Sequence, residues 1–312
     1  MLAKNDFLLS IIIPVFNERG NIKALIDRLL PVVKNYRYEL IFIDDGSIDD
    51  TEKEIKKLAK KNSNIKLISF YRNFGHQMAL SCGYTESSGD CIVSMDSDLQ
   101  DPPEIISELI SKWQKGAMVV YAKRKTRNAD NLFKRVSASF FYKIINFLSD
   151  VPIPNDVGDF RLLDRKVVDY LNSLPEKSRF LRGLVAWGGF PATFVYYNRE
   201  KRNAGDTHYT FGKMMNFALD GITSFSLKPL RIATFFGFLA ALVGFLGMIY
   251  AIIEKIYFPQ YIVTGWAAIF VGLMFLGGVQ LITIGIIGEY IGKIFTQVRK
   301  RPSYTVKEKF NI

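Results

Sequence analysis

The chain has 312 residues and carries 41 Lys and Arg against 30 Asp and Glu, a formal net charge of +11 at pH 7. Such a basic excess could indicate nucleic acid, but no recognised nucleic-acid motif or basic stripe with interleaved aromatic residues is present. We therefore expect lipid headgroups or nucleotide phosphates as anionic partners, and no nucleic acid. Cys82 and Cys91 are too few for a disulfide framework, and two histidines exclude a His-rich metal site.

The first part of the chain alternates between predicted strands and helices. In chain order we expect strand 9–15, helix 21–33, strand 39–43, a helix ending at 61, strand 65–71, helix 76–87, strand 91–95, helix 104–114 and strand 118–122. This alternation predicts an α/β fold with a mostly parallel sheet and helices on both faces. Because residues 1–6 lead straight into a strand, we expect no signal peptide. Later, a helix and a Pro-rich loop over 128–159, regular structure over 160–171 and a strand at 194–197 are expected.

Polar side chains follow several of these strands where each strand ends. They are Asn17, Glu18, Asp44, Asp45, Asp96, Ser97, Asp98 and Arg124. In parallel α/β sheets, ligands bind beyond the carboxyl ends of the strands. Asp96 and Asp98 follow a buried strand and suit Mg²⁺ or Mn²⁺, which is held by one or two carboxylates plus substrate phosphates. A helix N-cap before Pro102 would account for Asp101 but not for this pair.

The last third of the chain contains two long uncharged segments. They cover 232–253 and about 264–288, and each is long enough to cross a bilayer core. The alternative is a buried helix of a soluble protein. Basic residues flank the outer ends of both segments: Lys228, Arg231, Lys293, Arg299, Lys300 and Arg301. Since the connecting loop holds only Lys255 against Glu254, both termini are predicted to be cytoplasmic.

These features divide the chain into four parts. We expect a cytoplasmic catalytic domain over 1–210, an amphipathic juxtamembrane helix over 211–228, a two-helix transmembrane hairpin over 229–292 and a cytoplasmic tail over 293–312. Apolar residues at spacings of three and four define the helix that begins at Phe211. It would lie at the membrane interface or dock on the catalytic domain.

An ordered set of motifs gives the chain a family resemblance. The motifs are Pro14-Val-Phe-Asn-Glu18, Asp44-Asp-Gly-Ser47, Arg72-Asn-Phe-Gly-His-Gln77, Asp96-Ser-Asp-Leu-Gln-Asp-Pro102 and Gly158-Asp-Phe-Arg-Leu162. Over nearly its whole length the chain resembles the inverting GT-A glycosyltransferases of family 2. Within that family it is most similar to the polyprenyl-phosphate branch, which contains the bactoprenol glucosyltransferases and dolichyl-phosphate mannose synthase. The two C-terminal apolar segments match the bactoprenol group in number and placement.

The resemblance implies roles for individual residues on the donor side. The nucleoside pocket would be lined by Pro14, Phe16, Glu18, Asp44 and Asp45. Asp96 would contact the ribose or a metal-linked phosphate, with Ser97 beside it, and Asp98 and Gln100 would bind the metal. Arg124 would lie near the donor.

The sequence from Arg202 to His208 matches a phosphate-binding loop of the family, Arg-x-x-Gly-x-Ser-Lys. Here Thr207 replaces serine and His208 replaces lysine. The hydroxyl group is therefore kept, whereas a fixed positive charge becomes a titratable one. Arg202 is the basic residue that we expect to contact phosphate.

Asp159 and Arg161 would lie around the acceptor. A phosphate monoester is largely dianionic at neutral pH and can attack without a general base, so the task of the protein is positioning and charge management. Asp159 is expected either to act as a base or to orient other groups. Arg161 would bind the acceptor phosphate or pair with a nearby aspartate.

The predicted reaction is metal-dependent, inverting transfer of a hexose to undecaprenyl phosphate, with UDP-glucose as the expected donor. Alternative donors are GDP-mannose, UDP-N-acetylglucosamine and UDP-4-formamido-arabinose. A processive synthase would need a Gln-x-x-Arg-Trp motif, which is absent. A non-catalytic membrane scaffold is the alternative from another class, but it gives no reason for the carboxylate pair. The family resemblance also allows a tetramer.

Overall fold

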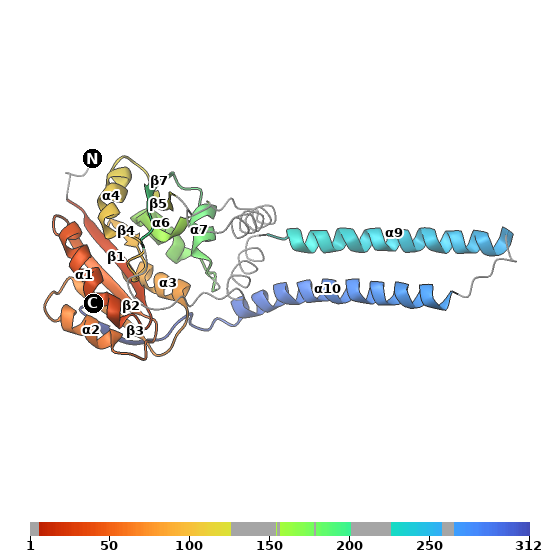
Figure 1. Ribbon diagram of the computed structural model, residues 1–312, viewed down its shortest axis with the longest axis horizontal. Coiled ribbons are helices and arrows are strands. Elements are labelled where there is room, and N and C mark those ends of the chain that lie inside the picture. Colours follow the sequence, from red (N-terminus) through yellow and green to blue (C-terminus); the bar gives the residue numbers. More distant parts are fainter. Residues whose placement is uncertain (1–5, 126–153, 155–156, 178, 201–225, 258–264) are drawn as a thin grey trace.

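The computed structural model describes residues 6–125, 154, 157–177, 179–200, 226–257 and 265–312. An α/β domain forms one end of the molecule, and two long helices project from it side by side (Figure 1). The C-terminus lies back on the α/β domain, so the chain leaves the domain, forms the hairpin and returns.

The α/β domain is built on one eight-stranded sheet with the order β7-β5-β6-β4-β1-β2-β3-β8. The strands are β1 (Leu8–Val15), β2 (Arg37–Asp44), β3 (Ile65–Phe70), β4 (Cys91–Ser94), β5 (Val119–Arg124), β6 (Val157–Asp164), β7 (Ala192–Tyr197) and β8 (Val306–Phe310). β1, β2, β3 and β4 pair in parallel, as do β5 and β7. β6 is antiparallel to β4 and β5, and β8 is antiparallel to β3. The predicted mostly parallel sheet is confirmed.

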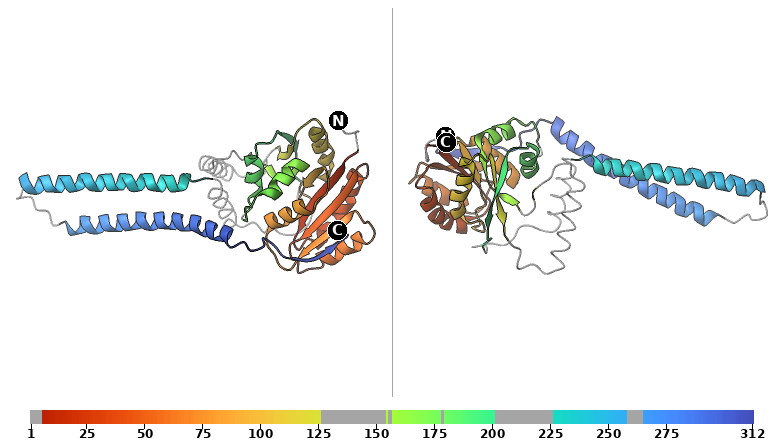
Figure 2. Two further views of the ribbon diagram at one scale, coloured as in Figure 1. Left: turned by 180° about the vertical axis from the view of Figure 1, so that it is seen from behind. Right: turned by 90° about the horizontal axis from the view of Figure 1, so that it is seen from above.

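Helices cover both faces of this sheet (Figure 2). They are α1 (Arg19–Val33), α2 (Thr51–Ala59), α3 (His76–Glu86), the 3₁₀ helix η1 (Pro103–Ile105), α4 (Ile106–Gln114), α6 (Arg165–Ser173) and α7 (Leu181–Trp187). Alternate residues of β1 point to opposite faces: Ile11 and Ile13 pack with α1, α2 and α4, whereas Ile12 packs with α3, α6 and α7. Two apolar cores therefore hold the central strands rigidly and fix their carboxyl ends.

The strands and helices predicted up to residue 122 are all present with closely similar bounds. The expected loop before residue 160 is wrong at its end, because β6 already begins at Val157. Residues 126–153, where a helix was expected, lie outside the described residues, as do residues 201–225, which hold most of the expected amphipathic helix.

The tail after the hairpin contains a strand that the sequence does not signal. β8 adds to the outer side of β3, and charged residues occupy the three central positions of its five, so the strand lacks an alternating apolar pattern. Lys307 pairs with Glu52 at 2.9 Å and Lys309 with Glu86 at 2.6 Å. These ion pairs hold an edge strand whose exposed charges also disfavour pairing with other chains.

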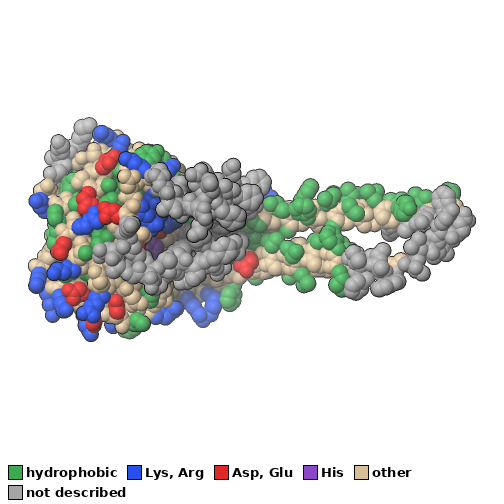
Figure 3. All heavy atoms as spheres, in the orientation of Figure 1, with side chains coloured by type: hydrophobic (Ala, Val, Ile, Leu, Met, Phe, Trp, Pro, Cys, Tyr) green, Lys and Arg blue, Asp and Glu red, His purple; other side chains and the backbone are tan. Residues whose placement is uncertain are grey.

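The projecting hairpin consists of α9 (Lys228–Tyr257) and α10 (Trp266–Val298). With a rise of about 1.5 Å per residue, each helix exceeds the ~30 Å of a bilayer core. Their most apolar windows, within Lys228–Gly247 and Gly272–Val298, are not buried in the protein. Hydrophobic side chains run along both helices, whereas charged side chains are spread over the α/β domain (Figure 3). The two expected apolar helices are confirmed, and both are candidate membrane spans.

Close packing of α3 on the sheet gives a first testable prediction. A Cβ atom at Gly83 would lie 2.2 Å from Cγ2 of Ile12, inside the second core. We expect Gly83→Ala to lower the free energy of unfolding by about 1–3 kcal/mol, because the strand and helix must separate. Thermal unfolding of the detergent-purified protein measures the change.

Gly237→Ala in α9 is the control, since its Cβ would meet no described atom within 4 Å. A Gly83→Ala protein as stable as the wild type would show that α3 does not pack against β1 in this way.

Candidate functional site

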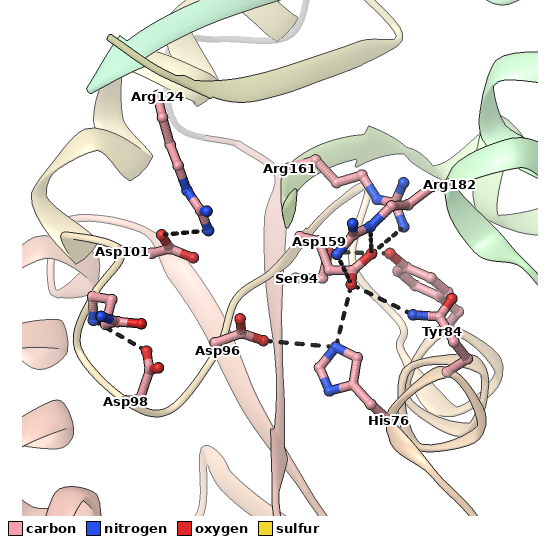
Figure 4. Close-up of polar contacts among 12 residues, drawn as sticks. His76, Tyr84, Ser94, Asp96, Asp98, Asp101, Arg124, Asp159, Arg161 and Arg182 are labelled. Atoms are coloured by element: carbon pink, nitrogen blue, oxygen red, sulfur yellow. Dashed lines mark hydrogen bonds and ion pairs between the residues drawn. The ribbon is translucent and has the colours of Figure 1, made fainter. Parts of the chain in front are cut away.

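The predicted site residues lie together at the end of the sheet where its parallel strands have their carboxyl ends. Asp44 ends β2, Asp96 to Gln100 follow β4, and Arg124 ends β5. β6 runs antiparallel to β4, so its early residues Asp159 and Arg161 lie at the same edge. Figure 4 shows Asp159 in contact with Arg161, Arg182 of α7 and His76 of α3. Asp96 connects to this group through His76, whereas Asp98 and the Asp101–Arg124 pair lie to one side of it.

Asp159 is the centre of a buried hydrogen-bonded cluster. Its carboxylate accepts from Arg182 Nε at 3.1 Å and Nη2 at 2.9 Å, from Arg161 Nη2 at 3.3 Å and from Gln77 Nε2 at 3.4 Å. Desolvation would raise the pKa of Asp159, but Arg182, His76 and Arg161 outweigh it and hold the pKa well below its usual range. Asp159 therefore stays ionised and accepts a proton poorly.

Arg161 is fully buried and its charge is balanced by Asp159. Its Nε and Nη1 atoms have no hydrogen-bond partner among the described residues. Its guanidinium also lies near the phenol ring of Tyr84, which donates to Ser94 Oγ. The arrangement matches the expected aspartate pair rather than an exposed phosphate ligand.

His76 connects this cluster to the expected metal loop. Its Nε2 lies 3.4 Å from Asp159 Oδ2 and 3.6 Å from Asp96 Oδ1 (Figure 4). Desolvation lowers the pKa of His76, but the hydrogen bond to Asp159 and the charge of Asp96 exceed that effect and raise it. The imidazole of His76 thus lies between the two carboxylates and links them.

Sequence reasoning assigned no role to His76, Gln77 or Arg182. His76 and Gln77 belong to the quoted Arg72–Gln77 motif, and that motif was the available signal. Arg182 stands in α7, far from the motifs in sequence, so nothing local pointed to it.

The loop after β4 carries the expected metal ligands. Asp96 has a side chain that is 38% exposed, whereas Asp98 is buried and its Oδ1 accepts from the main-chain N–H of Gln100 at 3.1 Å. The buried Ser97 lies between them. The Gln100 side-chain oxygen accepts from Arg199. This loop thus offers two carboxylates and one amide.

Among the described residues, no group of three or more His, Cys, Asp or Glu forms a self-sufficient metal site. Mg²⁺ and Mn²⁺ do not require one, because they keep waters and take substrate phosphates as ligands. The oxygen donors of Asp96, Asp98 and Gln100 fit such a cation, and Gln100 would then release Arg199.

Asp101 is held in a second buried pair next to this loop. Tyr197 donates to Asp101 and accepts from Arg124 Nε at 3.2 Å, while Arg124 Nη2 lies 4.0 Å from Asp101. Burial and the charge of Asp96 raise the pKa of Asp101 to about 6. Arg124 therefore lies beside this loop at the carboxyl end of β5. The Asp101 carboxylate accepts from Tyr197 and does not cap the following helix, which was the alternative role for it.

The residues expected around a nucleoside lie along the ends of β1 and β2. Pro14 is buried beside Ile43 and Phe16 is half-buried. Glu18 is half-buried at the start of α1, where its Oε2 accepts from Asn21 Nδ2 at 2.5 Å.

Asp44 and Asp45 are both buried, and their burial raises both pKa values. Asp44 accepts from the Ser47 N–H at 3.0 Å. Asp45 accepts from the N–H groups of Phe74 and Gly75 at 2.7 and 2.9 Å. Asp45 thus fixes the turn that begins α3 and so helps to place His76. Arg202, Thr207 and His208 lie outside the described residues.

This site can now be compared with known proteins. The sequence pattern of "Glycosyl transferase family 2" matches residues 10–171, which include β1 to β6 and most of the site. The chain belongs to glycosyl transferase family 2. Its α/β domain is the GT-A catalytic domain that the motifs predicted, and the protein is an enzyme of this family.

Relatives of this family 2 glycosyltransferase align far beyond the matched domain. An uncharacterized glycosyltransferase of Synechocystis sp. is 44% identical, covering 96% of this chain and 95% of its own. A prophage bactoprenol glucosyl transferase homolog of Escherichia coli is 43% identical, with 96% and 98% covered. The bactoprenol glucosyl transferase of Shigella phage SfII is also 43% identical, with 96% and 97% covered. The similarity therefore includes the hairpin.

Because Asp159 is the carboxylate of a buried charge cluster, its removal should lower the free energy of unfolding strongly. Asp159→Asn leaves Arg161 without its counter-charge in a fully buried position, and we expect a loss of about 3–5 kcal/mol of unfolding free energy. Because the pKa of Asp159 is lowered, this contribution is present above the ordinary aspartate pKa and disappears only in stronger acid. Thermal melts from neutral pH to about pH 3 measure it.

Asp169→Asn is the matched control, since Asp169 has a side chain that is 63% exposed and pairs with Arg165 at 3.6 Å. Its melting point should change little, because exposed pairs contribute about 0–1 kcal/mol. Equal effects of the two substitutions would contradict the assigned role of Asp159.

The raised pKa of Asp101 predicts that its contribution to folding stability depends on pH with the opposite sign. Its folded-state pKa of about 6 is raised, so ionisation opposes folding as the pH rises through that value. Between about pH 4 and pH 7 the wild type should lose roughly 3 kcal/mol relative to Asp101→Asn. Melting both proteins across that range in metal-free buffer tests this; parallel curves would rule it out.

Proposed function

We propose that this enzyme transfers glucose from UDP-glucose to undecaprenyl phosphate and inverts the anomeric carbon. The observation that carries the proposal is the Asp96–Asp98 loop, which lies beside a buried Asp159 cluster in a chain with two candidate spans. Relatives that align over 96% of the chain, hairpin included, are named bactoprenol glucosyl transferases, which supports a prenyl phosphate acceptor and a glucosyl donor.

On the donor side, Asp96, Asp98 and Gln100 are proposed to hold Mg²⁺ or Mn²⁺ against the diphosphate. When bound, the cation would offset the negative charge that develops on the departing nucleoside diphosphate. Pro14, Phe16, Glu18, Asp44 and Asp45 would frame the nucleoside, and Arg124 would lie near its phosphates. Arg202, Thr207 and His208 are proposed to contact the phosphates as well.

On the acceptor side, we propose that Asp159 orients rather than accepts a proton. Its carboxylate already accepts from two arginines, and its lowered pKa makes it a weak base. Arg182, whose side chain is 29% exposed, would face the acceptor phosphate, while the buried Arg161 supports Asp159.

The chemistry needs no proton transfer. A dianionic phosphate oxygen forms the new bond to the sugar carbon as the bond from that carbon to the diphosphate breaks. The electron pair leaves with the nucleoside diphosphate. Attack in line from the opposite face inverts the anomeric centre, so positioning of the two phosphates is the main task of the protein.

The hairpin is proposed to cross the cytoplasmic membrane with both termini in the cytoplasm. Lys228 and Arg231 lie in the first turn of α9, and Arg299 to Arg301 follow α10, which matches the positive-inside rule. The site edge would then face the inner leaflet, where the acceptor phosphate is found. GDP-mannose, UDP-N-acetylglucosamine and UDP-4-formamido-arabinose are the alternative donors.

Removing one metal-loop carboxylate tests the enzyme reaction. We expect Asp98→Ala to reduce transfer by at least about 100-fold while the protein remains folded and membrane-bound. The assay combines purified protein, undecaprenyl phosphate, Mg²⁺ or Mn²⁺ and each candidate nucleotide sugar. Transfer should be greatest with UDP-glucose and should stop with a chelator.

Asp27→Ala is the control, because Asp27 is an exposed carboxylate on α1 outside the site. Wild-type turnover by Asp98→Ala in metal-buffered detergent would reject the metal assignment. If none of the nucleotide sugars yields product, the result would favour a non-catalytic scaffold.

A further inference from the structure

A cavity lies away from the candidate site, between α3, the loop that joins α6 to α7, and the segment that follows α10. Its volume is about 370 Å³, within the range of small-ligand sites. Ser81 and Thr85 of α3 line one side, and Ser303 and Tyr304 line another. None of the candidate site residues lines it.

Two positive charges line this cavity against a single negative charge, that of Glu176. Among the described residues, neither Lys177 nor Arg179 has an ion pair within 4 Å. Arg179 donates to the main-chain carbonyls of Glu176 and Leu174 at 3.3 and 3.1 Å. Desolvation lowers the pKa of Arg179, and the opposing effect of the Glu176 carboxylate does not make up for it. A bound anion would supply the missing charge.

The cavity lining also includes a carboxylate, which an anion alone cannot satisfy. Glu176 lines it, and the buried Oε2 atom of Glu176 has no hydrogen-bond partner among the described residues. A buried acceptor without a donor costs about 1–3 kcal/mol. A ligand that fits this lining therefore brings a negative group for Lys177 and Arg179 and an N–H donor for Glu176.

The position of the cavity connects the hairpin to the catalytic domain. The main-chain N–H of Lys177 donates to the side-chain oxygen of Gln297, near the end of α10, at 2.8 Å. On the other side, Ser81 Oγ donates to the carbonyl of Gln77, whose side chain donates to Asp159. A ligand here would contact both the segment that follows α10 and α3, the helix that begins at His76. Figure 1 shows that α10 ends beside the α/β domain.

We propose that this cavity binds a phosphoethanolamine group, with its phosphate on Lys177 and Arg179 and its ammonium on Glu176. The two cations and one carboxylate are complementary to a phosphate that carries a primary ammonium. The group could belong to a membrane phospholipid or to a soluble phosphate ester. The proposal concerns binding alone and stands apart from the transferase reaction.

Binding to the full-length protein in detergent tests the proposal in two arms. One arm titrates O-phosphoethanolamine against phosphocholine by calorimetry, and the other measures phosphatidylethanolamine against phosphatidylcholine by native mass spectrometry. Choline is the matched chemical control, because its trimethylammonium has no N–H donor. We expect saturable binding with about a tenfold preference for ethanolamine, corresponding to about 1.4 kcal/mol. Saturation in the first arm identifies a soluble ester, and saturation in the second alone identifies a lipid.

Variants then assign the binding to this cavity. Lys177→Gln keeps the main-chain bond to Gln297 and should weaken ethanolamine binding about tenfold. Glu176→Gln, which is nearly isosteric, should remove the preference over choline. Lys166→Gln, an exposed lysine on the neighbouring α6, should change neither value.

Three outcomes would overturn the proposal. They are the absence of saturable binding in both arms, equal affinity for ethanolamine and choline compounds, and an equal effect of Lys177→Gln and Lys166→Gln. Melting temperatures of the variants close to that of the wild type show that each comparison is made on folded protein.

Discussion

The site depends on the ion pairs and hydrogen bonds that the ionised carboxylate of Asp159 makes. It balances Arg161, which is fully buried, and it accepts two hydrogen bonds from Arg182 of α7. His76 of α3 connects it to Asp96 in the loop after β4. One charged group thus holds β6, α3, α7 and the expected metal loop in a single arrangement. Its contact with Arg161 is fully buried and is therefore stronger than the same contact would be at the surface.

Most of the sheet could be predicted because its signals are local. β1, β2 and β4 contain the apolar runs Ile11–Val15, Leu40–Ile43 and Cys91–Val93, as expected for strands covered on both faces. Amphipathic segments such as α2 mark the helices between them. β8 escaped prediction because its charged centre has no apolar period and its pairing with β3 joins residues far apart in sequence.

The candidate site was predictable on its donor side, where short motifs follow strand ends, and less so on its acceptor side. Arg182 has no local signature and meets Asp159 only because α7 packs beside β6. Sequence alone also does not reveal that both carboxylate oxygens of Asp45 accept hydrogen bonds from the turn before α3. Nor does it reveal that Arg161 is fully buried. These facts arise from tertiary packing, which sequence spacing does not encode.

The two outer strands of the sheet have a consequence for the whole enzyme. The chain leaves the sheet from β7 at one edge, passes through the hairpin and re-enters as β8 at the opposite edge. A domain joined to the hairpin through a single linker would rotate freely against it, whereas attachment at two opposite sides of the sheet limits that rotation. The fold itself thereby restricts which way the reacting face can turn, without help from any second protein.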